Sequence, residues 1–196
     1  MEKLDITGIV LAGGKSSRMG TDKSLMILNG KTLIQQAIDI LHPLCGKVVI
    51  SSNDNKFDFT GCEVWPDEYP IQAPLIGIYS CLKRSSTDIN LVLSCDMPNV
   101  NVELLSFMLN NLNSYETVVP EHNNLLEPLC GIYRKSVLPV LEDTIKNSNY
   151  KLMELLKKTS ALYLEIKPEH TFYTKDLFVN INTKEDFNKL QNKTTL

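Results

Sequence analysis

The chain has 196 residues, of which 43% are hydrophobic and 22% are charged, and this composition argues against a disordered or collagen-like protein. Its 20 lysines and arginines stand against 23 aspartates and glutamates, which gives a formal charge of −3. Proteins that bind nucleic acid or a membrane surface through charge carry a basic excess, so neither kind of partner is expected. We expect a single domain over residues 1–196.

Cysteine usage and the N-terminal residues favour a cytoplasmic protein. The five cysteines are widely spaced and form no Cys-x-x-Cys pair, so we expect reduced thiols rather than a disulfide framework or a zinc knuckle. The charged N-terminus leads directly into an apolar segment, which is unlike a secretory signal. No apolar run approaches the ~18 residues that a membrane-spanning helix needs.

Strand-like and helix-like segments alternate along the chain. In chain order, the apolar patterns predict a strand at 8–12, a helix at 33–41, strands at 48–50 and 63–65, a helix at 76–82, a strand at 91–93, a helix at 102–112, strands at 117–119 and 129–133, helices at 137–146 and 151–158, and a strand at 162–166. Asn101 is expected to cap the helix at 102–112, and Thr183 and Asp186 have the spacing of a capping box before a last helix. The alternation predicts an α/β fold, a Rossmann-like, doubly wound, mostly parallel sheet with helices on both faces.

Ligands in such folds bind beyond the carboxyl ends of the strands, so we expect a site at the turns after Ala12, Trp65 and Leu93. Asp96 follows the apolar strand at 91–93, where a lone carboxylate is a natural ligand for magnesium. The residues alone equally allow Asp96 to cap a loop.

The turn after the first strand has the composition of a phosphate-binding loop. Gly13 and Gly14 let backbone N–H groups approach a phosphate without a Cβ in the way. Lys15, Arg18 and Lys23 add three cations, and Lys23 is expected to be exposed in a polar turn. The glycine spacing fits neither a P-loop nor the dinucleotide fingerprint.

This turn resembles the signature of the molybdenum cofactor guanylyltransferases, the MobA family, in the run Leu11-Ala12-Gly13-Gly14-x-Ser16-x-Arg18-Met19-Gly20-x-Asp22-Lys23. Their fold is like that of the nucleotide-diphospho-sugar transferases. Sugar-phosphate relatives usually carry a proline before the lysine, whereas Asp22 precedes Lys23 here, which favours the molybdopterin branch. The resemblance covers essentially the whole chain and includes Ala-Pro-Leu-Ile-Gly at 73–77, which resembles the family's opening of the next helix.

The resemblance implies an enzyme that uses Mg²⁺, transfers GMP from GTP to the terminal phosphate of molybdopterin and releases pyrophosphate. It implies catalytic roles for Arg18, Lys23 and Asp96, with Asp96 as the metal ligand. The implied nucleotide-binding residues are Leu11, Ala12, Gly13, Gly14, Lys23, Ser51, Asp67 and Asp96. Asn180 and Asn182, in a carboxyl-terminal Asn-x-Asn-Thr motif, are the implied acceptor-site residues.

Some alternatives stay open. Many family members have an asparagine where Ser51 stands, so the nucleotide contact falls to either Ser51 or Asn53. A molybdopterin cytidylyltransferase or a sugar-phosphate nucleotidyltransferase of the same fold is the alternative activity, since no residue identifies the base. A nucleotide-binding regulator without chemistry is a different class, and Lys23 and Asp96 argue against it. Contact with other proteins of molybdenum-cofactor biosynthesis is also left open.

Overall fold

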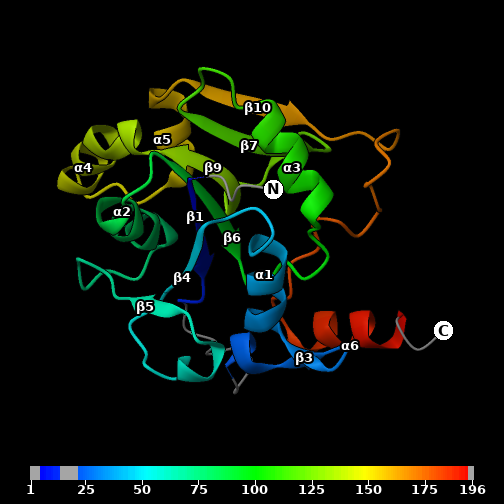
Figure 1. Cartoon of the computed structure of the whole chain (residues 1–196). Helices are drawn as coiled ribbons and strands as arrows, with labels where there is room; N and C mark the ends of the chain where they lie inside the picture. Colours follow the sequence, from blue (N-terminus) through cyan, green and yellow to red (C-terminus); the bar gives the residue numbers. More distant parts are fainter. Residues whose placement is uncertain (1–4, 14–21, 194–196) are drawn as a thin grey trace.

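The computed structural model describes residues 5–13 and 22–193, and its centre is a twisted mixed sheet with the strand order β10-β7-β9-β6-β1-β4-β5 (Figure 1). The strands of this sheet are β1 Ile6–Leu11, β4 Lys47–Ser51, β5 Glu63–Trp65, β6 Ile89–Ser94, β7 Thr117–His122, β8 Leu125–Leu126, which pairs with β7, β9 Cys130–Arg134 and β10 Ala161–Glu165. The α-helices are α1 Leu33–Leu41, α2 Pro74–Arg84, α3 Val102–Asn110, α4 Leu138–Lys146, α5 Leu152–Lys158 and α6 Lys184–Lys193. Short 3-10 helices are η1 Lys23–Leu25, η2 Asp58–Thr60 and η3 Lys135–Val137.

The expected mostly parallel sheet is confirmed, with β9 as its main exception. β1 is parallel to both β4 and β6, β4 is parallel to β5, and β7 is parallel to β10. β9 runs antiparallel between β6 and β7. The chain builds outward from β1 through β4 to β5 and then returns to place β6 on the other side of β1. This reversal makes the carboxyl ends of β1 and β6 the topological switch point, where ligands bind in open α/β sheets.

Helices cover both faces of the sheet, as expected, because its central strands are apolar on both sides. In β1, Ile6 and Val10 face the core that includes α1 and α3, while Ile9 and Leu11 face the core that includes α2, α4 and α5. Figure 1 shows these two groups of helices on opposite sides of the sheet. The two cores enclose the central strands, whose carboxyl ends are thereby positioned to form the base of a site.

A small hairpin of β2 Ile27–Leu28 and β3 Lys31–Thr32 does not appear among the expected elements. Its turn is Asn29-Gly30, whose φ angles of 55° and 79° suit the hairpin turns that join two strands closely. The hairpin and α6 share a third apolar cluster, whose buried members are Leu28, Leu33, Ile181, Phe187 and Leu190. The segment before α6 therefore returns to the region that follows the first loop, and Figure 1 shows α6 beside β3.

Both expected helix caps are confirmed. The Asn101 side chain accepts a hydrogen bond from the backbone N–H of Leu104 at 2.9 Å. Thr183 and Asp186 form the reciprocal capping box of α6: the Asp186 N–H donates to Thr183 Oγ1 at 3.1 Å, and the Thr183 N–H donates to Asp186 Oδ2 at 2.8 Å. None of the helices formed by the described residues is long and apolar enough to cross a membrane.

Candidate active site

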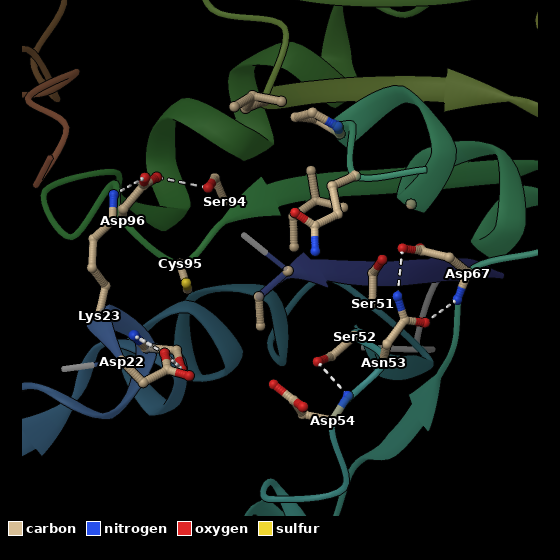
Figure 2. Close-up of a pocket in the computed structure, with 18 of the residues that line it drawn as sticks. Asp22, Lys23, Ser51, Ser52, Asn53, Asp54, Asp67, Ser94, Cys95 and Asp96 are labelled. Carbon is tan, nitrogen blue, oxygen red and sulfur yellow. Dashed lines mark hydrogen bonds and ion pairs between the residues drawn. The ribbon is translucent and has the colours of Figure 1, made fainter. Parts of the chain in front are cut away.

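A pocket of about 490 Å³ lies at the carboxyl ends of β1, β4 and β6, beside the start of α2. The sequence-predicted residues that line it are Leu11, Ala12, Gly13, Lys23, Ser51, Asp67 and Asp96. Gly14 and Arg18 lie outside the described residues. Figure 2 shows the Lys23–Asp96 pair on one side of the pocket and the Asn53–Asp67 pair on the other. Strand ends far apart in the sequence thus meet around one cavity, as expected for this fold.

Asp96 projects from the turn that follows β6 and is held on both of its oxygens. Ser94 donates its hydroxyl hydrogen to Asp96 Oδ1 at 2.6 Å, and Lys23 Nζ lies 3.2 Å from Asp96 Oδ2 (Figure 2). The side chains of Lys23 and Asp96 are only 20% and 19% exposed. A fixed carboxylate that faces a lysine inside a pocket is suited to bind a cation together with the anionic groups around it. Ser94 was not among the site residues predicted from the sequence, since a serine at the end of a strand does not by itself indicate a functional role.

Lys23 joins η1 to the segment before α6. Its ammonium also donates to the Ile181 carbonyl at 2.8 Å and to Asn182 Oδ1 at 3.3 Å, while the Ile181 N–H donates to the Asp96 carbonyl at 2.9 Å. The expectation that Lys23 is exposed is therefore wrong, because three partners enclose its ammonium. Asn182 reaches the site through Lys23, whereas the Asn180 side chain donates to the Phe178 carbonyl at 3.2 Å.

Asp22 positions Lys23 from the preceding residue. Asp22 is the N-cap of η1, and its Oδ1 accepts hydrogen bonds from the backbone N–H of Ser24 at 2.9 Å and from the Ser24 hydroxyl at 2.6 Å. Burial raises the pKa of Asp22, but hydrogen bonds from Lys56 and Ser24 outweigh it and hold that pKa below its ordinary value. The cap fixes the turn that begins with Lys23.

Asn53 and Asp67 form a two-way pair on the opposite side of the pocket. Asn53 Nδ2 donates to Asp67 Oδ2 at 2.9 Å, and the Asp67 N–H donates to Asn53 Oδ1 at 2.8 Å (Figure 2). Burial raises the pKa of Asp67 more than Asn53 and Arg84 lower it, so the carboxyl titrates above its ordinary value. Ser51 and Asn53 both line the pocket, and the Ser51 carbonyl accepts from the Ala12 N–H at 3.2 Å. Asn53 thus holds Asp67, while Ser51 is 3% exposed at the end of β4.

The helix α2 begins at the pocket, and its fourth residue, Gly77, packs against Ser51. A Cβ on Gly77 would lie 2.6 Å from Ser51 Oγ and 3.7 Å from Asp67 Oδ1. Pro74 occupies the first turn of α2 and lines the pocket with Ala73, so the positive end of the helix dipole faces the cavity.

We expect Gly77→Ala to weaken nucleotide binding, because the new methyl group displaces the Ser51 hydroxyl and crowds the pocket. The double variant Gly77→Ala/Ser51→Ala should regain much of the folded-state stability that the single variant loses, since it removes the atom in the way. Chemical denaturation and calorimetric titration with nucleotide measure the two effects. Replacing glycine with alanine inside a helix typically stabilises the folded state by ~1 kcal/mol. A Gly77→Ala variant that shows this gain in the free energy of unfolding and binds nucleotide normally would contradict the packing argument.

Four carboxylates stand on the described part of the pocket wall. Within the part of the chain that the structure describes, Asp22, Asp54, Asp67 and Asp96 line the cavity, with Lys23 as the lysine among them. These carboxylates attract a polyphosphate that brings a divalent cation.

A pocket at the switch point of a doubly wound sheet, with a helix N-terminus and a lysine–carboxylate pair on its wall, defines the class of nucleotide-handling α/β proteins. The model of the MobA-like NTP transferase domain matches residues 8–162, and the chain belongs to this family. The resemblance found in the first loop is thereby confirmed.

Individual relatives agree with the family assignment. A protein of Carboxydothermus hydrogenoformans, named "Probable molybdenum cofactor guanylyltransferase", is 31% identical over 188 residues, which are 95% of this chain and 95% of that one. A protein of the same name from Clostridium perfringens strain SM101 is 35% identical over 188 residues, 94% of this chain and 95% of that one. The crystal structure of molybdopterin-guanine dinucleotide biosynthesis protein A from Archaeoglobus fulgidus superimposes with a TM-score of 0.82 at 24% identity, covering 96% of this chain and 98% of that one. The expected fold is thus confirmed.

Proposed function

We propose that this enzyme transfers GMP from GTP to the terminal phosphate of molybdopterin, forms molybdopterin guanine dinucleotide and releases pyrophosphate. Family membership and the names of the two relatives support the reaction. The structural observation that carries it is the Lys23–Asp96 pair, which stands on the wall of a pocket large enough for a nucleotide.

The acceptor in this reaction is already a phosphate anion, so it needs no strong general base. The barrier comes from repulsion between two anions and from charge that develops on the departing pyrophosphate. Positioning and electrostatic stabilisation supply most of the catalysis in such phosphoryl transfers. Lys23, fixed by the Asp22 cap and by the Ile181 carbonyl, carries a positive charge on the pocket wall that can offset the charge of the phosphates. Gly13 lines the pocket after β1, where its backbone can approach a phosphate.

The donor set around Asp96 fits Mg²⁺. Among the described residues there is no group of three or more His, Cys, Asp or Glu side chains that could enclose a metal. Mg²⁺ is commonly held by one or two carboxylates together with substrate phosphates and water, and Asp96 offers one oriented carboxylate. When bound there, the ion would offset phosphate charge. Ser94 orients Asp96 Oδ1 by its hydrogen bond, and Lys23 pairs with Oδ2.

The acceptor enters beside Lys23. Asn182 lies next to the Lys23 ammonium at 3.3 Å, so its amide can contact a group that approaches the α-phosphate. Asn180 stands two residues earlier in the same segment, and its amide is oriented by the Phe178 carbonyl. The contact of Asn182 with Lys23 supports an acceptor site formed by the segment before α6.

We expect GTP with Mg²⁺ to raise the melting temperature of the protein more than ATP, CTP or UTP does at equal concentration, because the preferred ligand stabilises the folded state by mass action. At a concentration of 100 times the dissociation constant, this linkage contributes about 2.7 kcal/mol. Thermal unfolding with each nucleotide measures it. CTP as the most stabilising ligand would move the protein to a molybdopterin cytidylyltransferase.

Pyrophosphate release separates an enzyme from a nucleotide-binding regulator. Purified protein with GTP, Mg²⁺ and molybdopterin should release pyrophosphate in proportion to the dinucleotide formed. Tight GTP binding without pyrophosphate release under these conditions would contradict the enzyme and favour the regulator.

A further inference from the structure

Lys56 links the two loops that border the pocket, although it belongs to no motif that the sequence pattern singled out. Its ammonium is ion-paired with Asp22 Oδ2 and lies 2.6 Å from Asp54 Oδ2. Asp22 follows the loop after β1, and Asp54 follows β4, and both carboxylates line the pocket. Lys56 itself is absent from the residues that line the cavity.

The position of Lys56 is fixed by packing as well as by charge. Its ammonium lies 5.2 Å from the ring centroid of Phe57, a side chain that is fully buried in the core. Burial lowers the pKa of Lys56, but its contacts with Asp22 and Asp54 outweigh this and hold the pKa above its ordinary value. Lys56 is therefore a permanently charged, partly enclosed cation, with its side chain 31% exposed. A cation held by two carboxylates and an aromatic ring loses less freedom on pairing than an isolated surface lysine does.

Asp22 uses its two oxygens for two different purposes. Oδ1 caps η1 by accepting hydrogen bonds from Ser24, and Oδ2 forms the ion pair with Lys56. Because η1 begins with Lys23, whose ammonium reaches Asp96, one chain of contacts runs from Lys56 through Asp22 to the turn that carries Lys23. Lys56 also offsets the negative charge of Asp22 and Asp54, which otherwise repels the phosphates of an incoming nucleotide.

We propose that Lys56 is a positioning residue for nucleotide binding: it fixes the Asp22 cap under Lys23 and neutralises the carboxylates of Asp22 and Asp54, and it acts through them rather than by touching the phosphates. This inference rests on the proposed function, because it assumes that the pocket takes a nucleoside triphosphate. It assigns a role in nucleotide binding to the loop after β4, which lies outside the signature at residues 11–23.

The test is calorimetric titration of GTP with Mg²⁺ into the full chain and its Lys56→Met variant, together with steady-state kinetics. Methionine keeps most of the side-chain length and removes the charge. We expect the dissociation constant and KM for GTP to rise about fivefold, as expected for a charge lost several ångströms from an anion in a partly solvated site. Lys56→Arg should restore binding, because arginine can pair with the same two carboxylates.

Two further variants show whether the effect passes through Asp22. In Lys56→Met/Asp22→Asn, the asparagine can still cap η1 and the uncompensated charge of Asp22 is gone, while that of Asp54 remains. We expect this double variant to bind GTP more tightly than Lys56→Met alone. Lys47→Met is the matched control: Lys47 lies 2.6 Å from a carboxylate oxygen of Glu63 and 5.3 Å from the Trp65 ring centroid, but it stands at the opposite end of β4 and away from the pocket. It should bind GTP as the wild type does.

Each outcome decides between these readings. Rescue by Asp22→Asn together with normal binding by Lys47→Met supports the inference. A double variant that binds no better than Lys56→Met indicates that Lys56 touches the nucleotide directly, and it overturns the inference. Wild-type affinity in a folded Lys56→Met, or a lower melting temperature with normal affinity, also overturns it. A wild-type protein that binds no GTP contradicts the proposed function itself, and the inference falls with it.

Discussion

Replacing Asp96 with asparagine is expected to abolish nearly all guanylyl transfer while the protein stays folded. Asparagine keeps the shape and still accepts the Ser94 hydroxyl hydrogen, but it loses the charge that faces Lys23 and that a hard dication requires. Loss of one electrostatic contact in the transition state commonly costs about 100-fold or more in turnover. Pyrophosphate release, metal dependence and melting temperature, measured on one preparation, give the result.

The matched control is Asp88→Asn. Asp88 precedes β6 at the end away from the pocket and is paired with Arg134, so its loss removes an aspartate charge near the same strand without reaching the site. We expect wild-type turnover from this variant. If Asp96 only caps a loop, Asp96→Asn should lower the melting temperature and keep the activity per folded molecule. If Asp96→Asn shows normal turnover at saturating magnesium, Asp96 is not the metal ligand.

The second large effect is expected for Lys23→Ala, which should lower both turnover and stability. The variant removes from the pocket a cation that we propose binds the phosphates, and it takes the ammonium away from the Ile181 carbonyl and Asp96 Oδ2. A hydrogen bond to a charged group that is lost from a partly buried position costs roughly 1–3 kcal/mol. Urea denaturation and pyrophosphate release per folded molecule measure the two losses.

Lys31→Ala is the control for this variant. Lys31 lies nearby on β3 and pairs with Asp39 at 2.6 Å, but its side chain is 60% exposed. Surface ion pairs of this kind contribute about 0–1 kcal/mol, so this variant should change neither measurement appreciably. A folded Lys23→Ala protein with unchanged kinetics would remove Lys23 from the site, and one with full stability would show that the contact with Ile181 is not important for the fold.

The apolar runs predicted the strands because the central sheet is buried on both faces, which leaves a continuous signal in segments such as 91–93. The ends shifted by a few residues: the strand expected at 8–12 is Ile6–Leu11, and the helix expected at 102–112 ends at Asn110. The direction of β9 could not be read from its residues, since an apolar strand looks the same whichever way it runs. The β2–β3 hairpin was missed because each strand has only two residues.

The pocket-lining residues at strand ends could be predicted from the sequence, whereas the contacts between distant segments could not. Gly13, Ser51, Asp67 and Asp96 each follow or end a strand, and parallel strands bring their carboxyl ends to one edge. The contact of Lys23 with Ile181 joins residues 158 positions apart, and no local pattern encodes it. The same holds for the ion pair between Lys56 and Asp22.

Ile181 makes the geometry of the Lys23–Asp96 pair depend on a segment that is synthesised late. Its N–H binds the Asp96 carbonyl, its own carbonyl binds Lys23, and its side chain is fully buried between the hairpin and α6. A nascent chain that has emerged from the ribosome only as far as the end of β10 contains every strand of the main sheet but lacks this residue. Such a chain can pair these strands before Ile181 is available to contact Lys23 and Asp96, so we expect the described arrangement of this pair to form only after residue 181 has emerged.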